Sequence, residues 1–176
     1  MIDFSRTHFA LFGLPERFRC PTEALDRAYR ALQTEVHPDR FAAAAEAERR
    51  MALQASARVN EAYRTLKDPV ARAEYLLTLR DGGASAADDR KLPLQFLERQ
   101  LERRERADVA ERARDAAMLE ALLVEVRAEA QALEEQLAGL LDTDGAWETA
   151  RATAREFRFL AKLAADLDVM LDGLDD

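Results

Sequence analysis

Hydrophobic residues in the first half of this chain recur at spacings of three and four, which is the repeat of an amphipathic α-helix. Over residues 22–36, one helical face carries Leu25, Ala28, Tyr29, Leu32 and Val36. Over residues 51–66, a second face carries Met51, Ala55, Val59, Ala62, Tyr63 and Leu66. Because only a short stretch around Pro38 separates the two stripes, they predict an antiparallel helical hairpin.

Shorter elements are predicted at both ends of this hairpin. The aromatic and aliphatic residues at 8–13 are enough for one or two helical turns docked on a core. Thr22 is placed to cap the first hairpin helix, and Asp68 followed by Pro69 is placed to start a further short helix. Together these elements predict a domain over residues 1–80.

The second half of the chain predicts a separate helical domain. Residues 81–92 are rich in Gly, Ala and Asp and lack periodicity, so a linker is expected there. A helix is predicted to begin at Pro93. The longest apolar repeat follows over residues 116–140 with the alternating spacing of a packed helix pair, and a last stripe covers 147–171. We therefore expect a three-helix bundle over residues 93–176.

The composition predicts an almost entirely helical protein. Of 176 residues, 48% are hydrophobic and 34% are charged, and the dominant Ala, Leu, Glu and Arg favour an all-α fold. The net charge of −8 is a poor match to nucleic acid, which binds concentrated Lys and Arg. No apolar run reaches the roughly 20 residues of a membrane span and no signal-peptide pattern is present. A cytoplasmic protein without a nucleic-acid or membrane partner is therefore expected.

Few residues offer catalytic or metal-binding chemistry. One cysteine, Cys20, allows neither an intrachain disulfide nor a cysteine-based metal cluster, and it is interpreted as a small, partly buried residue. His8 and His37 are the two histidines, and no HExxH, nucleophile elbow or phosphate loop is present. We therefore expect no enzymatic activity, no metal and no cofactor.

The His37-Pro38-Asp39 turn is the candidate functional feature of the first domain. Pro38 lacks a backbone donor and disfavours helical geometry at His37, so the preceding helix should stop at Val36. An imidazole and a carboxylate would then face water between the two hairpin helices. The simpler interpretation is that Pro38 only breaks the chain, and that His37 and Asp39 are solvated loop residues.

The N-terminal half resembles the J-domain family. The stretches that carry the resemblance are Phe9 to Leu14, Ala28 to Leu32, His37-Pro38-Asp39-Arg40, Asn60 to Leu66, and Asp68-Pro69. The resemblance implies a co-chaperone that stimulates ATP hydrolysis by a DnaK-type chaperone and catalyses nothing covalent itself. The residues that would dock on the ATPase are His37, Pro38, Asp39, Arg40, Arg27 and Arg30.

A finer resemblance, to the HscB co-chaperones of iron–sulfur cluster assembly, covers nearly the whole chain. It rests on Leu11 to Pro15, His37 to Phe41, Arg72 to Leu77, Phe96 to Glu105 and Phe157 to Leu160. It implies that the chain brings an IscU-type scaffold to an HscA-type chaperone and aids cluster transfer, while the cluster stays on the scaffold. The implied scaffold-binding residues are Leu97, Leu101, Glu102, Glu105 and Phe159.

The residues themselves leave the role of this second surface open. Leu97, Leu101 and Glu105 share one helical face, which suits an apolar anchor with an acidic flank. Leu97 and Leu101 are equally well placed to be bundle core. The core interpretation is stronger for Phe159, because its apolar neighbours cannot all face the same way.

Some positions depart from the family pattern. Glu98 stands where an apolar residue is common, and Val109 stands near a position that is commonly acidic. The basic stripe formed by Arg27 and Arg30 is thin, so we expect salt-sensitive docking on the ATPase. Alternative functions are a J-domain adaptor for a different client and a self-associating helical protein. A monomer is expected, with a dimer as the alternative.

Overall fold

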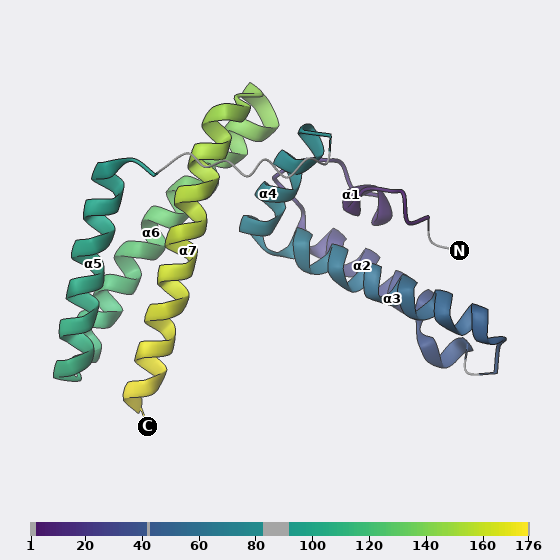
Figure 1. Ribbon diagram of the computed structural model, residues 1–176, viewed down its shortest axis with the longest axis horizontal. Coiled ribbons are helices and arrows are strands. Elements are labelled where there is room, and N and C mark those ends of the chain that lie inside the picture. The colour runs from purple at the N-terminus through teal and green to yellow at the C-terminus, as the bar shows by residue number, and fades with distance from the viewer. Residues whose placement is uncertain (1–2, 42, 83–91, 176) are drawn as a thin grey trace. The chain divides into compact units, whose positions relative to one another are not determined.

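The computed structural model describes residues 3–41, 43–82 and 92–175, and every regular element within these ranges is a helix (Figure 1). The predicted all-α fold is therefore confirmed. The chain divides into two compact units, Met1–Arg80 and Asp81–Asp176. Most of the linker expected at residues 81–92 lies outside the described residues.

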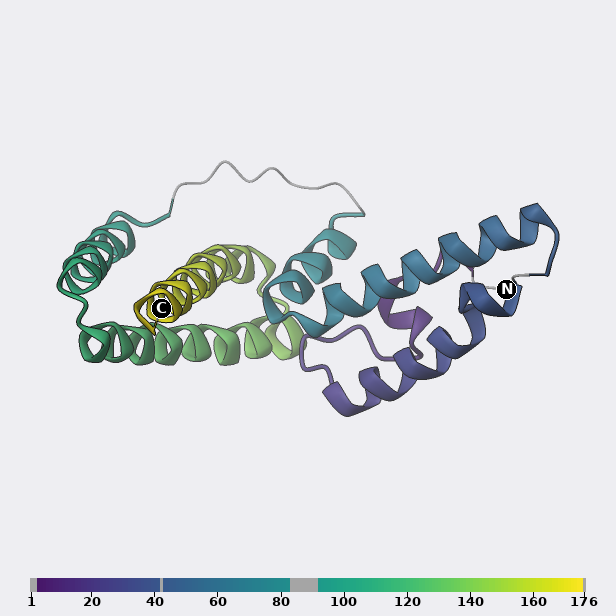
Figure 2. The same ribbon diagram turned by 90° about the horizontal axis from the view of Figure 1, so that it is seen from below.

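The first unit is built on the predicted hairpin. Its elements are α1 (His8–Leu11), α2 (Thr22–Val36), η1 (Pro38–Phe41), α3 (Glu46–Lys67) and α4 (Pro69–Arg80). Helices α2 and α3 run antiparallel side by side, and η1 lies in the connection between them (Figure 2). The largest fully buried side chains of this unit are Phe9, Phe18, Leu25, Val59 and Leu66.

The helix ends of the first unit follow local chemistry, with one exception. The Asp68 carboxylate accepts a hydrogen bond from the Ala71 amide at 2.7 Å and Pro69 begins α4, as predicted. The prediction that Thr22 caps α2 is wrong, because Thr22 is the first helical residue and the cap is Pro21. The Pro21 carbonyl accepts from the amide of Leu25 at 3.1 Å, but the proline side chain has no acceptor, so no side chain caps the first turn.

Polar contacts join α2 to α3 along the hairpin. The rings of Tyr29 and Tyr63 stack with centroids 4.0 Å apart. The Asp26 carboxylate accepts from Lys67 Nζ at 2.8 Å and from the Tyr63 hydroxyl at 3.0 Å. These two hydrogen bonds, the Lys67 bond first, lower the pKa of Asp26 below its ordinary value of 3.8. The contacts hold the two helices in register at the end of the hairpin that lies away from the turn.

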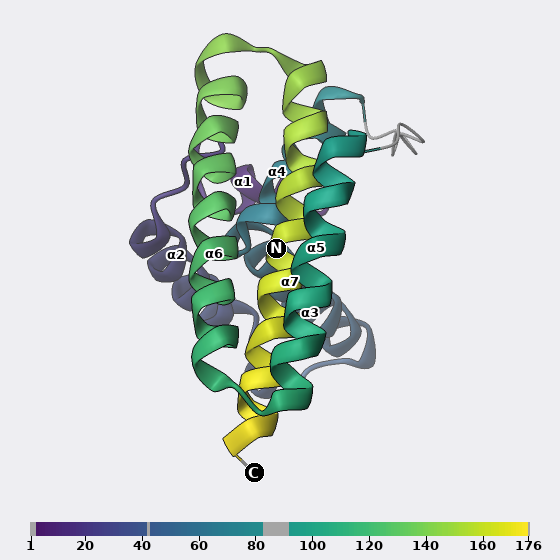
Figure 3. The same ribbon diagram turned by 90° about the vertical axis from the view of Figure 1, so that its left-hand side faces the viewer.

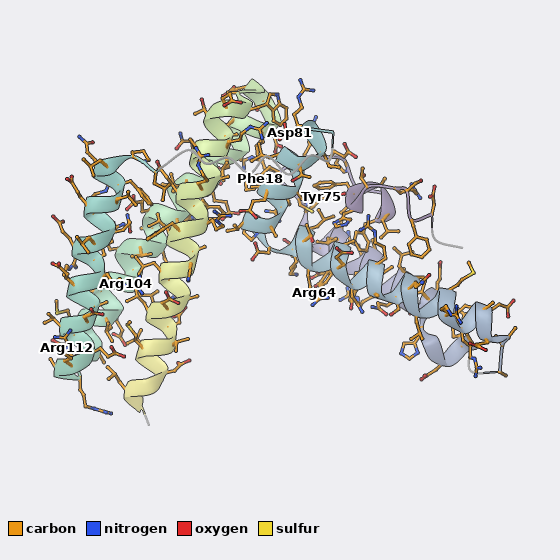
Figure 4. The ribbon with its side chains drawn as sticks, in the orientation of Figure 1. Phe18, Arg64, Tyr75, Asp81, Arg104 and Arg112 are labelled. Carbon is orange, nitrogen blue, oxygen red and sulfur yellow. The ribbon has the colours of Figure 1, made fainter. Side chains whose placement is uncertain are left out.

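Aromatic contacts join the short helices of the first unit. The ring of His8 stacks on Tyr75 of α4 with centroids 4.2 Å apart, and the His8 amide donates to the Tyr75 hydroxyl at 2.9 Å (Figure 4). Burial lowers the pKa of the His8 imidazole. The Arg72 guanidinium, also on α4, lies 4.9 Å from the Phe18 ring centroid. His8 is thus a packing residue that links α1 to α4.

The second unit is a bundle of three long helices. They are α5 (Leu94–Ala113), α6 (Ala116–Gly139) and α7 (Trp147–Asp175), with the π-helical turn η2 (Leu140–Asp144) between the last two (Figure 3). Arg114 takes a left-handed conformation, with φ of 50°, and ends α5. The Asp115 carboxylate then accepts from the Met118 amide at 3.0 Å and caps α6.

The apolar seam predicted along α6 contributes to the core of this bundle. Leu119, Leu123, Val126 and Leu137 are buried, whereas Ala116 at the start of the helix is exposed. Helix α7 is the main partner of α6, as expected for a helix pair. The core side chains are Phe96, Ala107, Ala110, Leu119, Leu122, Leu123, Val126, Leu160, Leu163 and Leu167.

Candidate functional site

The His37-Pro38-Asp39 turn follows directly from the end of α2. The helix stops at Val36, as predicted, and His37 has φ of −58° and ψ of 127°. This extended conformation is the one that a following proline imposes, because the proline ring excludes helical ψ at the preceding residue. Pro38 then opens the short helix η1. The reversal of the chain is therefore set by the covalent structure of one residue.

Both functional groups of the turn face solvent. The side chains of His37 and Asp39 are 54% and 90% exposed. The Asp39 amide donates to His37 Nδ1 at 3.3 Å, and one Asp39 carboxylate oxygen lies 3.5 Å from the same nitrogen. The imidazole thus braces the backbone of the turn, while the carboxylate is free to accept hydrogen bonds from another molecule.

The predicted basic residues lie on α2 and on the turn itself. Arg27 and Arg30 are exposed, and their spacing places them on one face of α2 with Thr34. Arg27 lies 3.7 Å from the carboxylate of Glu23. Arg40 is also exposed, and its guanidinium donates to the carbonyl of Thr34 at 3.2 Å. Arg40 therefore ties the turn back to the last turns of α2.

A hollow behind the turn was not predicted from the sequence. It has a volume of about 430 Å³ and is lined by residues of α1, α2, η1, α3 and the segment before α1. Its apolar lining is Phe4, Leu11, Leu32, Val36, Phe41, Met51, Ala52 and Ala55. The small residues Ala52 and Ala55 on α3 give it depth. Of these two alanines, Ala55 belongs to the second apolar stripe, and its small size was the signal available in the sequence.

The second predicted surface lies on α5, and the structure decides between the two interpretations of its leucines. Leu97 and Leu101 are 40% and 60% exposed, so they are surface residues and not bundle core. Leu94 and Val109 extend the same face and are 71% and 56% exposed. These four residues form the apolar stripe of α5.

Acidic residues accompany the apolar stripe. Glu102 and Glu105 are both exposed, and together with Arg106, Val109 and Met118 they line a shallow hollow of about 420 Å³. Met118 of α6 could not be placed beside Val109 from the sequence, because the two residues lie on different helices. The stripe thus ends in a depression that combines apolar and acidic groups.

Phe159 is packed differently from the exposed leucines. It is half-buried, packs against the bundle core, and meets Phe96 edge to face with ring centroids 5.7 Å apart. The structure therefore brings Leu97, Leu101, Glu102 and Glu105 together on α5 and places Phe159 under that helix.

The described residues also bear on metal binding, on the cysteine and on membrane insertion. No group of three or more His, Cys, Asp or Glu in this part of the chain could hold a metal ion. Cys20 is half-buried as predicted, and its burial raises the pKa of its thiol. Among the same residues, no helix is both long and apolar enough to span a bilayer.

Comparison with known proteins assigns a family to each unit. Residues 7–75 match the DnaJ domain family, and residues 92–168 match the HSCB C-terminal oligomerisation domain family. The co-chaperone protein HscB homologue of Burkholderia multivorans is 44% identical over 175 residues, which is 99% of both chains. That of Ralstonia nicotianae is 45% identical over 172 residues, or 98% of both chains.

Solved structures show the same similarity. Chaperone HscB from Vibrio cholerae superposes with a TM-score of 0.85 at 38% identity, covering 96% of this chain and 99% of that one. The human co-chaperone protein HscB gives a TM-score of 0.87 at 27% identity, covering 96% of this chain and 83% of the human chain. The similarity therefore includes both units.

Proposed function

Because the chain belongs to the HscB family of J-domain co-chaperones, we propose that it stimulates the ATPase of a DnaK/HscA-type chaperone and delivers an IscU-type iron–sulfur scaffold to it. The observation that carries this proposal is the presence of two exposed surfaces, the His37-Pro38-Asp39 turn on one unit and the apolar stripe on the other. The ATP chemistry belongs to the chaperone, and the cluster belongs to the scaffold.

The turn is suited to docking on a cationic partner. A carboxylate whose backbone is already fixed loses little conformational entropy when it binds. Asp39 can therefore form a charge-assisted hydrogen bond with an arginine of the ATPase, and Arg27 and Arg30 can pair with acidic residues of the same partner. Mutual charge complementarity of this kind accelerates association and selects the orientation of the complex.

The stripe is suited to an apolar partner surface with basic residues at its edge. Burying a fully exposed leucine side chain contributes about 1.5–3 kcal/mol. Leu97 and Leu101 are 40% and 60% exposed, so each can contribute part of that energy to the core of a small interface. Glu102 and Glu105 would pair with cations at the rim. These residues would hold the scaffold while the turn engages the chaperone.

The test separates the two surfaces in the full-length chain. His37→Gln should abolish stimulation of single-turnover ATP hydrolysis by an HscA-type chaperone and leave capture of an IscU-type scaffold unchanged. The double variant Leu97→Ala, Leu101→Ala should weaken scaffold capture at least tenfold and leave basal stimulation unchanged. Leu53→Ala, an exposed leucine on α3, is the matched control and should change neither. Equal loss of both activities in either variant would contradict the proposal.

A second function is favoured by the description of the C-terminal family as an oligomerisation domain. In this alternative the stripe binds a second copy of the chain or a client other than the scaffold. Light scattering distinguishes self-association from scaffold delivery. A stable dimer of the native chain that is lost in the Leu97→Ala, Leu101→Ala variant would show that the stripe binds a second copy.

A further inference from the structure

Helix α5 carries apolar residues on two opposite faces, and only one of these faces is buried. The buried face contains Phe96, Ala107 and Ala110, whereas the exposed face is the apolar stripe. Leu101 and Arg103 are two positions apart and therefore point about 200° apart around the helix. Burial of apolar surface alone does not determine which face turns inward.

Polar residues on the buried face oppose the observed orientation. Gln100 and Arg103 are 3% and 6% exposed. The side-chain nitrogen of Gln100 has no hydrogen-bond partner among the described residues, which is unfavourable for a buried amide. A rotation of α5 that moved these residues to the surface would bring leucines of the stripe toward the core. Some other interaction must hold the helix as it is.

That interaction is an ion-pair cluster formed by Arg103 of α5 with Glu125 and Glu129 of α6. Arg103 Nη2 donates to Glu125 at 2.9 Å and to Glu129 at 2.6 Å, and its Nε donates to Glu125 at 3.0 Å. Arg106 Nη1 donates to the second oxygen of Glu125 at 3.0 Å, and Arg99 lies 3.6 Å from Glu129. A planar guanidinium bound to two carboxylates fixes direction as well as distance.

We propose that Arg103 is a positioning residue for the scaffold-binding surface, because its ion pairs with Glu125 and Glu129 set the rotation of α5 that keeps the apolar stripe in solvent. A single buried polar residue sets helix register in coiled coils, which is a comparable effect. The inference rests on the proposed function for the role of the stripe, but the rotation of α5 is independent of it.

The test uses Arg103→Gln, which removes the charge and keeps the position polar. In a Cys20→Ala background, a single cysteine is placed on the outer face by Glu98→Cys or on the inner face by Gln100→Cys, and its maleimide labelling rate is measured. In the native orientation, the thiol of the Glu98→Cys variant should react at least tenfold faster than the thiol of the Gln100→Cys variant. Arg103→Gln should reduce that ratio at least tenfold and weaken binding of an IscU-type scaffold at least tenfold.

Two control variants separate orientation from stability. Arg103→Met places an apolar residue on the inner face. The labelling ratio and scaffold binding should therefore be closer to their native values than in Arg103→Gln. Arg104→Gln alters an exposed arginine of α5 and should change neither (Figure 4). An unchanged labelling ratio in Arg103→Gln, or fast labelling of both positions through unfolding, would overturn the inference. Absence of scaffold binding by the native chain would contradict the proposed function, while the labelling ratio would still decide the role of Arg103.

Discussion

The two surfaces are held in shape over very different distances along the chain. The contacts that fix the His37-Pro38-Asp39 turn join residues two and six positions apart. The contacts that position α5 join Arg103 to residues 22 and 26 positions away on another helix. The turn is thus a local structure, whereas the apolar stripe depends on tertiary packing. The turn should tolerate changes elsewhere in its unit better than the stripe does.

The largest effects are expected from truncating the two cores. Leu66 of α3 and Leu122 of α6 are fully buried, and replacing either by alanine should cost about 2–5 kcal/mol of stability. Leu66→Ala should reduce chaperone stimulation through loss of the hairpin, and Leu122→Ala should reduce scaffold binding. Urea unfolding together with both functional assays measures these effects. Leu53→Ala should stay within about 0.5 kcal/mol of the native stability.

One outcome of these measurements would contradict the separate roles of the turn and the apolar stripe. If Leu122→Ala lowered chaperone stimulation as much as scaffold binding, the two units would not act separately. If the turn is the more local structure, residual ATPase stimulation should persist in Leu66→Ala at temperatures where the variant is still folded.

Salt should affect the two surfaces unequally. The Debye length shortens from about 10 Å at 0.1 M salt to about 3 Å at 1 M, so attraction between exposed charges is screened. Stimulation of the chaperone ATPase, which depends on Arg27, Arg30 and Asp39, should therefore fall several-fold over this range of salt. Scaffold binding through Leu97 and Leu101 should fall less, because apolar burial does not depend on screening. Titrations at increasing salt measure both, and equal slopes would contradict the contrast.

The smallest effect concerns the hairpin that carries the turn. Hydrogen bonds from Lys67 and Tyr63 hold the pKa of Asp26 below 3.8, so its carboxylate stabilises the folded state above that pH. This contribution is lost as the pH falls through the lowered pKa of the folded state. Asp26→Asn should lower the unfolding temperature at pH 7, and the difference should shrink below pH 3.8 and disappear once the pH is below the lowered pKa of the folded state. A difference that persisted in acid would exclude the ion pair as its cause.

The elements fixed by local chemistry could be predicted from the sequence. The hairpin follows from two apolar stripes around Pro38, and α4 follows from Asp68 and Pro69. The end of α2 at Val36 follows from the restriction that Pro38 places on His37. In each case the deciding residues are close together in the sequence, so a pattern of neighbours is sufficient.

The exposed face of α5 could not be predicted, for a physical reason. Its leucines repeat with the same spacing as its buried residues, so periodicity offers two orientations of one helix. Which of the two orientations α5 adopts depends on where Glu125 and Glu129 of α6 lie in space. The hollow behind the turn was missed for a related reason, since Phe4 and Met51 become neighbours only after folding.

The acidic residues beside the apolar stripe also bear on solubility. An exposed row of leucines invites aggregation, and charged residues placed beside such a row act as gatekeepers. Glu98, Glu102 and Glu105 are exposed on the same helix as the stripe. When two copies approach stripe to stripe, these carboxylates repel each other, and the net charge of −8 adds to that repulsion. A partner with basic residues meets no such barrier. The three carboxylates that repel a second copy of the chain therefore attract a partner of opposite charge.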